Sequence, residues 1–296
     1  MLPDARTATL PDSDLLAFGD GQLRELIVPR IMACREDFFL DSKDFAITAA
    51  QQAYRVPPRA LGRKLRDVRF IDATGKGGPA LRLIPVEELD AYAGLTGVFA
   101  GGCGICLDGD VVKLVPTPST TSGTLRMRYY RFPSTLVAAS AGFVITGMEG
   151  TAVTGNVPTS WTTADTFDLT MSNPGFDLLG KDLAAGTVTA GTSIVLSATP
   201  SSELAIGDYV TLAMQTAVPH LPMEWHGVLA QAIAVKACEA LKDAQGMQFA
   251  QAKLDIALGD ALKLLAPRVD AHPKKVGGGS GRGGVLRNKP RGRFWP

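Results

Sequence analysis

Residues 105–114 read Ile-Cys-Leu-Asp-Gly-Asp-Val-Val-Lys-Leu, and this stretch predicts a β-hairpin. Two short apolar runs flank an Asp-Gly step, where Gly109 can adopt the positive φ that a tight turn between antiparallel strands requires. Just upstream, residues 85–89 begin with proline followed by acidic residues, a pattern that favours the first turn of a short helix. The hairpin makes this part of the chain β-rich.

A second strand is predicted at residues 125–131, which read Leu-Arg-Met-Arg-Tyr-Tyr-Arg. Successive side chains of a strand point to opposite faces, so Leu125, Met127 and Tyr129 share one face. The arginines between them share the other face. This alternation is typical of a strand that is buried on one side and hydrated on the other.

Residues 139–216 differ in composition from the rest of the chain. They are rich in Thr, Ser, Gly and Ala, and they contain seven acidic residues but only one basic residue, Lys181. Short β-branched runs separated by turn residues indicate strands. The runs are residues 143–146, 151–154, 166–171, 187–189, 193–196 and 209–213. We therefore expect an inserted small β-barrel or sandwich.

Helical patterns lie at both ends. Apolar residues recur at helical spacing between residues 13 and 39, with a break or kink expected near Pro29. After Pro222 a second helix is predicted, and a third is predicted to follow Gly246 and to end at Pro267. The last two helices should pair antiparallel through a short link.

These patterns predict an α+β fold, in which an amphipathic helical bundle carries a β-rich region, an inserted β-domain and an extended C-terminal tail. The expected boundaries are 1–138 for the N-terminal helix and β-rich region, 139–216 for the insert, 217–270 for the C-terminal helix pair and 271–296 for the tail. The chain has 296 residues, 46% of them hydrophobic, which is ordinary for a soluble globular protein. Its four cysteines are too few for a disulfide framework. A soluble protein assembled in the cytoplasm is expected.

Charge is distributed unevenly along the chain. Residues 274–296 contain seven basic residues and no acidic one, although the whole chain carries a net charge of only +1. Ordering such a segment would cost about 1–2 kcal/mol per residue, while burying each of its two aromatic side chains returns roughly 2–3 kcal/mol. A partner surface must therefore supply most of the contacts. The candidate partner-binding residues are Arg282, Arg287, Lys289, Arg291, Arg293, Phe294 and Trp295. Nonspecific contact with DNA and an idle tail are the alternatives.

A second group of basic residues lies in the β-rich region. It comprises Arg59, Arg63, Lys64, Arg66, Arg126 and Arg128. These side chains could contact DNA phosphates or an acidic neighbouring subunit, or they could form a solvated face. The residues alone do not separate these possibilities.

No catalytic grouping is found in the sequence. The three histidines do not lie at a spacing that suggests a catalytic pair, and the Cys103–Cys106 pair lacks the two further ligands of a structural zinc site. Residues 75–78 contain glycines and a lysine but lack the remaining pattern of a phosphate-binding loop, so they indicate a turn. We expect no enzyme activity, no cofactor and no metal.

The order of several motifs resembles the head-to-tail adaptor proteins of tailed bacteriophages. The matching segments are Tyr-Arg-Val-Pro-Pro-Arg-Ala at 54–60, Lys-Leu-Arg-Asp-Val at 64–68, Leu-Val-Pro-Thr-Pro at 114–118, Arg-Tyr-Tyr-Arg-Phe-Pro at 128–133 and Pro-Met-Glu-Trp-His at 222–226. The resemblance covers roughly residues 13–270 and implies a virion protein of the neck, assembled in the cytoplasm of the bacterial host. It implies a ring of twelve copies between the portal protein and the next neck or tail protein, with genomic DNA passing through the lumen and no contact with a membrane.

In similar adaptors the C-terminal segment reaches the portal, which implies this role for residues 282–296. An inserted barrel fits some of these adaptors and departs from the smaller, all-helical ones. The rival interpretation is a phage tail or fibre accessory whose β-insert binds a host surface. The few aromatic residues of the insert fall where a barrel needs core, which disfavours that rival.

Overall fold

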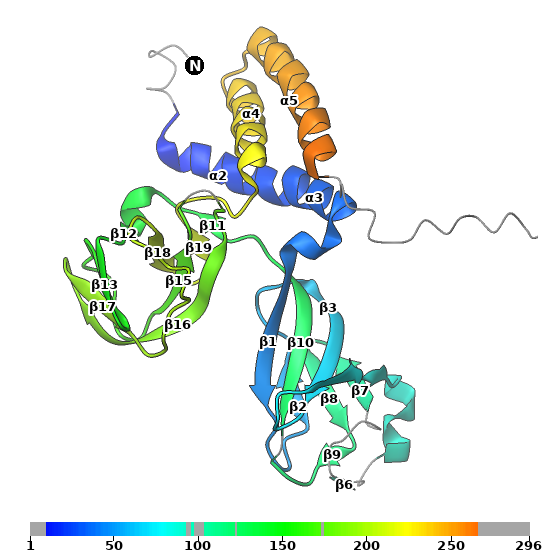
Figure 1. Cartoon of the computed structure of the whole chain (residues 1–296). Helices are drawn as coiled ribbons and strands as arrows, with labels where there is room; N and C mark the ends of the chain where they lie inside the picture. The colour runs from blue at the N-terminus through cyan, green and yellow to red at the C-terminus, as the bar shows by residue number, and fades with distance from the viewer. Residues whose placement is uncertain (1–9, 93–95, 98–103, 122, 173–174, 266–296) are drawn as a thin grey trace, which may run out of the picture.

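The structure is a computed structural model, and it describes residues 10–92, 96–97, 104–121, 123–172 and 175–265. Helices gather at one end of the molecule and two β-rich units hang from them side by side (Figure 1). The predicted α+β class is confirmed. The described residues include no helix that is both long and apolar enough to cross a membrane.

Four helical segments and two long helices share one hydrophobic core. They are α2 (Asp12–Gln22), the π-helical turn η1 (Leu23–Ile27), α3 (Val28–Cys34), the 3-10 turn η2 (Glu36–Phe39), α4 (Met223–Ala240) and α5 (Ala244–Leu265). Leu23, Ile27 and Ile31 from the N-terminal helix meet Trp225 and Leu229 of α4 in this core, and all five are buried. The apolar stripes predicted from the sequence thus face one another.

A break near Pro29 is not found, because the backbone stays helical from Asp12 to Cys34. The helix is irregular at the five residues of η1, which ends two residues before the proline. A proline ring clashes with the carbonyl four residues earlier, here that of Glu25, and it offers no N–H donor. A widened π-helical turn absorbs both effects without ending the helix.

The link between α4 and α5 is shorter than expected, and α5 begins before Gly246 rather than after it. The Gly246 amide donates to a carboxylate oxygen of Asp243 over 3.0 Å, so Asp243 supplies an acceptor for the first turn of α5. The Gln231 side-chain amide of α4 donates to the Ala250 carbonyl of α5 over 3.2 Å. The two helices form the predicted antiparallel pair (Figure 1).

The β-rich region consists of two four-stranded sheets and two short pairing strands. The first sheet has the order β1 (Leu40–Ala46), β10 (Thr124–Arg131), β3 (Ala60–Ile71) and β4 (Gly77–Ala80). The second has the order β2 (Ala53–Arg55), β8 (Val111–Val115), β7 (Gly104–Asp108) and β5 (Arg82–Leu83). The remaining elements are β6 (Thr96–Gly97), β9 (Thr117–Pro118) and a 3-10 helix, η3 (Val86–Tyr92), at the position of the predicted short helix.

Both strand predictions for this region are confirmed. Strands β7 and β8 form the hairpin, and Gly109 in its turn has a φ of +59°. In β10, Leu125, Met127 and Tyr129 are at most 1% exposed. They pack with residues of the second sheet in one buried cluster, which explains why their face of the strand is apolar.

The insert is a curled, seven-stranded sheet. Its order is β12 (Phe143–Val144), β18 (Tyr209–Leu212), β15 (Thr166–Thr170), β16 (Leu178–Thr189), β17 (Ser193–Leu196), β14 (Ala152–Thr154) and β13 (Gly147–Glu149). The two edge strands, β12 and β13, are consecutive in the chain: the Ile145 amide donates to Asp208 on one side, and the Thr146 amide donates to Thr154 on the other. In the described residues the sheet curls in this way without forming a closed barrel, so the barrel alternative is not confirmed.

The interior of the insert is aromatic. Phe143, Trp161 and Phe167 are at most 6% exposed. The centroid of the Trp161 ring lies 5.8 Å from that of Phe143 and 5.1 Å from that of Phe167. These rings therefore fill the core, as the sequence predicted. Most of β16, the part before residue 187, was not predicted as a strand.

The two chain segments that connect the insert lie side by side. Strand β11 (Thr135–Leu136) before the insert pairs in parallel with β19 (Gln215–Thr216) after it. Helix α2 and the following turn η1 hold this pair, because the Leu136 amide donates to Asp20 of α2 over 2.8 Å and Arg24 of η1 donates to the Thr135 hydroxyl over 3.0 Å. The insert is thus fastened at its base to the helical part. The exact domain boundaries stay a prediction.

Candidate interaction surfaces

A buried ion cluster joins the β-rich region to the insert. Arg59, at the start of β3, is only 2% exposed, and its guanidinium donates to both oxygens of Asp168 over 2.7 and 2.9 Å. The same group contacts Asp182, with the shortest distance at 2.8 Å. Asp168, at 0% exposed, also accepts the backbone amides of Asp182 and Met214, each over 3.0 Å. Every oxygen of this buried carboxylate is therefore satisfied.

The electrostatics of the cluster follow from burial and pairing. Burial disfavours the Arg59 cation, but hydrogen bonds with Asp182 and Asp168 overcome this and raise its pKa above the ordinary value. Burial also raises the pKa of the Asp168 carboxyl, against the opposing effects of Arg59 and the two amides. The guanidinium is consequently a fixed positive charge that holds two strands of the insert.

A second contact lies beside the first. Lys181 of β16 forms a salt bridge with Asp41 of β1 and donates to the Ser42 carbonyl over 2.6 Å. The Tyr129 hydroxyl donates to the same aspartate over 3.4 Å. Burial is the main cause of a raised pKa for this tyrosine, so it stays protonated. The only basic residue of the insert is thus used to dock it.

Arg59 was expected to contact DNA or a neighbouring subunit, but its side chain lies inside the protein. Its side chain is buried and fully used by acids of the same chain, so it offers nothing to DNA or to a neighbouring subunit. The reason is that the folded chain brings residues 168 and 182 of the insert next to residue 59.

The other predicted basic residues lie on the surface of β3 and β10. Arg126 and Arg128 are partly exposed and form salt bridges with Asp44 at 2.7 Å and Asp67 at 3.3 Å. Arg63 approaches Asp110 at 3.5 Å, while Lys64 and Arg66 are exposed. Part of this positive charge is therefore neutralised within the chain. Whether these residues bind a partner stays a prediction.

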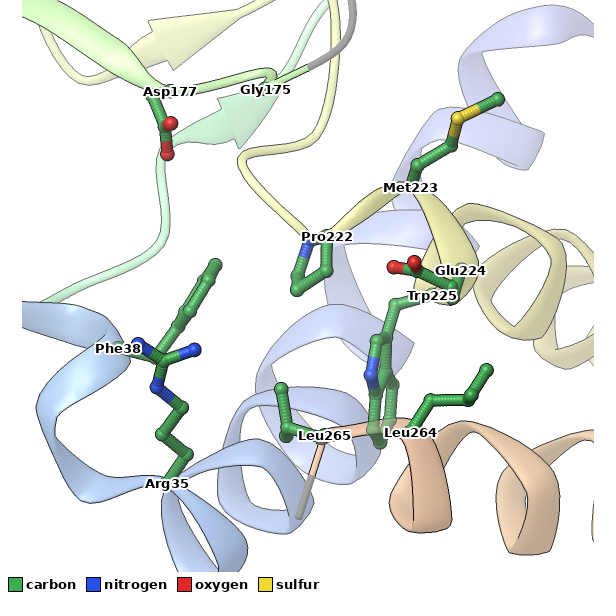
Figure 2. A pocket seen from close by; sticks show the side chains of 10 residues that line it. All are labelled: Arg35, Phe38, Gly175, Asp177, Pro222, Met223, Glu224, Trp225, Leu264 and Leu265. Carbon is green, nitrogen blue, oxygen red and sulfur yellow. The ribbon is translucent and has the colours of Figure 1, made fainter. Parts of the chain in front are cut away.

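A hollow of about 440 Å³ opens where the helices approach the insert (Figure 2). Its apolar wall includes Phe38 from η2, Trp225 from α4 and Leu265 from the end of α5. Asp177 of the insert and Glu224 of α4 add carboxylates, as Figure 2 shows.

Residues with catalytic or metal-binding potential are few in the described part of the chain. No group of three or more His, Cys, Asp or Glu side chains there could hold a metal ion. Cys106 is buried and Cys103 lies outside the described residues, so the spacing of the pair remains a feature of the sequence. His226 contacts the Leu221 carbonyl at 3.2 Å and stacks on Phe176, which ties it to the loop of the insert.

His220 was overlooked in the sequence, and so were Asp168 and Asp182. The His220 ring is 7% exposed, one ring nitrogen lies 2.9 Å from the Thr170 hydroxyl, and Nδ1 has no hydrogen-bond partner among the described residues. Burial and the nearby cations Arg131 and Arg59 lower its pKa to about 3, so it is neutral at physiological pH. No local sequence motif predicts that His220 is buried, because the residues around it come from distant segments of the chain.

The predicted partner-binding residues of the tail, from Arg282 to Trp295, lie outside the described residues. Their role rests on the sequence alone.

Residues 5–148 match the family model described as SU10 adaptor protein. The match spans the N-terminal helix, the β-rich region and the beginning of the insert. No curated protein matches the chain. Similarity to this family over the N-terminal part of the chain supports a bacteriophage adaptor-type protein.

Proposed function

We propose that this protein is a head-to-tail adaptor, twelve copies of which form a ring between the portal and the next neck or tail protein. Genomic DNA would pass through the lumen of this ring without sequence-specific binding. The match of residues 5–148 to the adaptor family is the observation that carries the proposal. The acidic insert is then a candidate for a surface that faces outward or toward the tail.

A closed ring requires heterologous contacts, in which one face of a subunit meets a different face of its neighbour. The buried charged and titratable groups of the chain suit a structural role better than a catalytic one. The charged groups buried most deeply, Arg59 and Asp168, join parts of the same chain, and burial keeps His220 neutral. Such groups hold a shape and do not exchange protons at physiological pH.

The C-terminal segment is proposed to attach the ring to the portal. Its basic side chains suit an acidic portal surface, and arginine and tryptophan dominate the energetics of many interfaces. We expect deletion of residues 282–296 to leave folding intact, since the helical core of the described residues is formed by side chains between Leu23 and Leu265. Attachment to the portal should weaken by at least about 30-fold, the effect of losing one strong aromatic contact.

Electron microscopy of the purified protein, mixed with the portal protein of the same phage, tests the ring. Binding of the deletion variant to the portal, measured by surface plasmon resonance, tests the tail. A matched control replaces Phe294 and Trp295 with serine and keeps every charge. If the aromatic side chains act as anchors, this control should lose most of the affinity. Unchanged attachment of the deletion variant would refute the role of the tail.

The rival function, a tail or fibre accessory that binds a host surface through the insert, gains little support. Phe143, Trp161 and Phe167 are buried in the core of the insert and form no exposed platform. Binding of the full chain to a glycan array would favour this rival, and turnover of any substrate would favour an enzyme.

A further inference from the structure

Helix α5 carries exposed apolar side chains outside the helical core, on the flank where Phe249 and Lys253 line a hollow beside α4. Phe249 is 64% exposed and Ile256 is 67% exposed, whereas Ala250 and Leu254 face the helical core. Phe249, Lys253 and Ile256 recur at spacings of four and three residues, so they form one stripe on a helix. Figure 1 shows that the α4–α5 pair projects from α2 on the side opposite to both β-rich units. We call these three residues the α5 stripe.

A groove of matching character lies between α2 and α4. It is a hollow of about 440 Å³ whose floor is formed by small and apolar side chains. Its lining residues are Ala17, Phe18, Gly21, Gln22, Glu25, Lys236, Glu239 and Ala240. Small residues such as Gly21 and Ala240 let another helix approach closely. We call this hollow the α2–α4 groove.

The groove and the stripe lie on different sides of the helix pair. Gln231 and Cys238 of α4 face α5, as shown by the hydrogen bond of Gln231 to Ala250 and by the close approach of Cys238 to Gly246. At 100° per residue, Lys236 and Ala240 point to the other side of α4. One copy therefore cannot fill its own groove with its own stripe, whereas a second copy can.

The charges of the two surfaces are complementary. Lys253 in the stripe has neither a hydrogen bond nor a salt bridge with any described residue of the chain, and the same is true of Glu25 at the groove. Close to the groove, Lys236 pairs with Glu239 at 2.8 Å and also interacts electrostatically with Glu25. The Lys253 ammonium on one surface and the Glu25 carboxylate on the other would form an ion pair on contact.

We propose that the α5 stripe of one copy docks into the α2–α4 groove of the next copy. This proposal rests on the proposed ring and names its subunit interface. The contact is heterologous, because a stripe meets a groove, and repetition of such a contact generates a closed ring when the rotation between copies closes. Phe249 and Ile256 fill the hollow, and Lys253 meets Glu25.

The apolar part is tested with Phe249→Ser and Ile256→Asn in the full chain. Both side chains are mostly exposed in the single copy, so the urea midpoint of the monomer should not change. Analytical ultracentrifugation measures the association of copies, both without other proteins and in the presence of the portal protein of the same phage. This association should weaken by on the order of 100-fold in the double variant. The matched control is Ile206→Asn, because Ile206 is 69% exposed but lies in the insert. The control should assemble like the wild type.

The charged part is tested by a mixing experiment. Copies with Lys253→Glu carry two acidic surfaces, and copies with Glu25→Lys carry two basic ones, so each variant alone should assemble poorly. A mixture of the two restores an attractive pair at every contact and should assemble close to wild-type strength. Only a heterologous contact between these two surfaces gives this pattern.

The outcomes distinguish the interface from the proposed function. Wild-type rings that persist in the Phe249→Ser, Ile256→Asn variant overturn the interface and leave the adaptor function standing. The same holds if the variant loses portal binding but still self-associates, since the stripe would then be a portal contact. A wild-type chain that stays monomeric at every concentration, alone and on the portal, overturns both.

Discussion

Replacing Arg59 with methionine would remove the cation that joins the β-rich region to the insert. Asp168 is 0% exposed, so it would be left as a buried carboxylate without its positive partner. Loss of one member of a buried ion pair typically costs 3–5 kcal/mol. Two effects reduce this cost. Asp168 still accepts hydrogen bonds from the backbone amides of Asp182 and Met214, and the Asp182 side chain is 36% exposed, so water can hydrate it. We therefore expect a loss at the lower end, about 3 kcal/mol.

Arg126→Met is the matched control for this change. Arg126 contacts Asp44 through two hydrogen bonds of 2.7 Å, a geometry as good as that of Arg59. The difference is exposure, because the two side chains of the control pair are 41% and 45% exposed. Exposed pairs contribute about 0–1 kcal/mol. The same substitution should therefore cost at least about 2 kcal/mol more at Arg59 than at Arg126.

Urea unfolding of the full chain measures both variants, with tryptophan fluorescence as the signal. Trp161 reports on the core of the insert and Trp225 on the helical core, since both are buried. Combining Arg59→Met with Asp168→Asn should recover about 1 kcal/mol or more, because the isolated buried charge is then removed. Equal midpoints for the Arg59 and Arg126 variants would refute the reasoning that burial makes this pair important.

Two further predictions concern His220 and the glycines. Burial holds the pKa of His220 at about 3 against an ordinary 6.5, so as pH falls below 6.5 the unfolded chain takes up a proton that the folded chain refuses. Stability should fall by roughly 2 kcal/mol between pH 7 and pH 5, and His220→Gln should remove this slope in urea titrations; an unchanged slope contradicts the assignment. Gly155→Ala should cost about 1–3 kcal/mol, because its Cβ would lie 2.3 Å from a ring carbon of Phe143. The same change at Gly259, where a Cβ meets nothing within 4 Å, should instead stabilise α5 by up to about 1 kcal/mol, as thermal unfolding can check.

The elements that the sequence predicted well are those with a strong local period. The hairpin at residues 105–114 has its turn glycine at a positive φ, and the alternation of residues 125–131 separates buried from partly exposed side chains. The helix pair and several strands of the insert also lie where they were expected. In each case a pattern of two or of three to four residues, together with a turn signal, carries the information.

The errors occur where a local signal has more than one structural outcome. Pro29 predicted a break or kink, and of these the break is absent, because a π-helical turn that ends two residues before the proline keeps the helix continuous. Gly246 was taken as a link, but it lies in the first turn of α5, where Asp243 accepts its amide hydrogen. Packing on the helical core favours the longer helix in both places.

What the sequence by itself determined is the class of fold, the order of helices and strands, and which face of each is apolar. Only the tertiary structure decided that Arg59 pairs with Asp168 and Asp182, which follow it by 109 and 123 residues in the chain. The same holds for the burial of His220, which keeps this side chain neutral. The physical reason is range: steric preference and the period of burial act over a few residues, whereas desolvation of a charge and its pairing arise only when distant segments pack together.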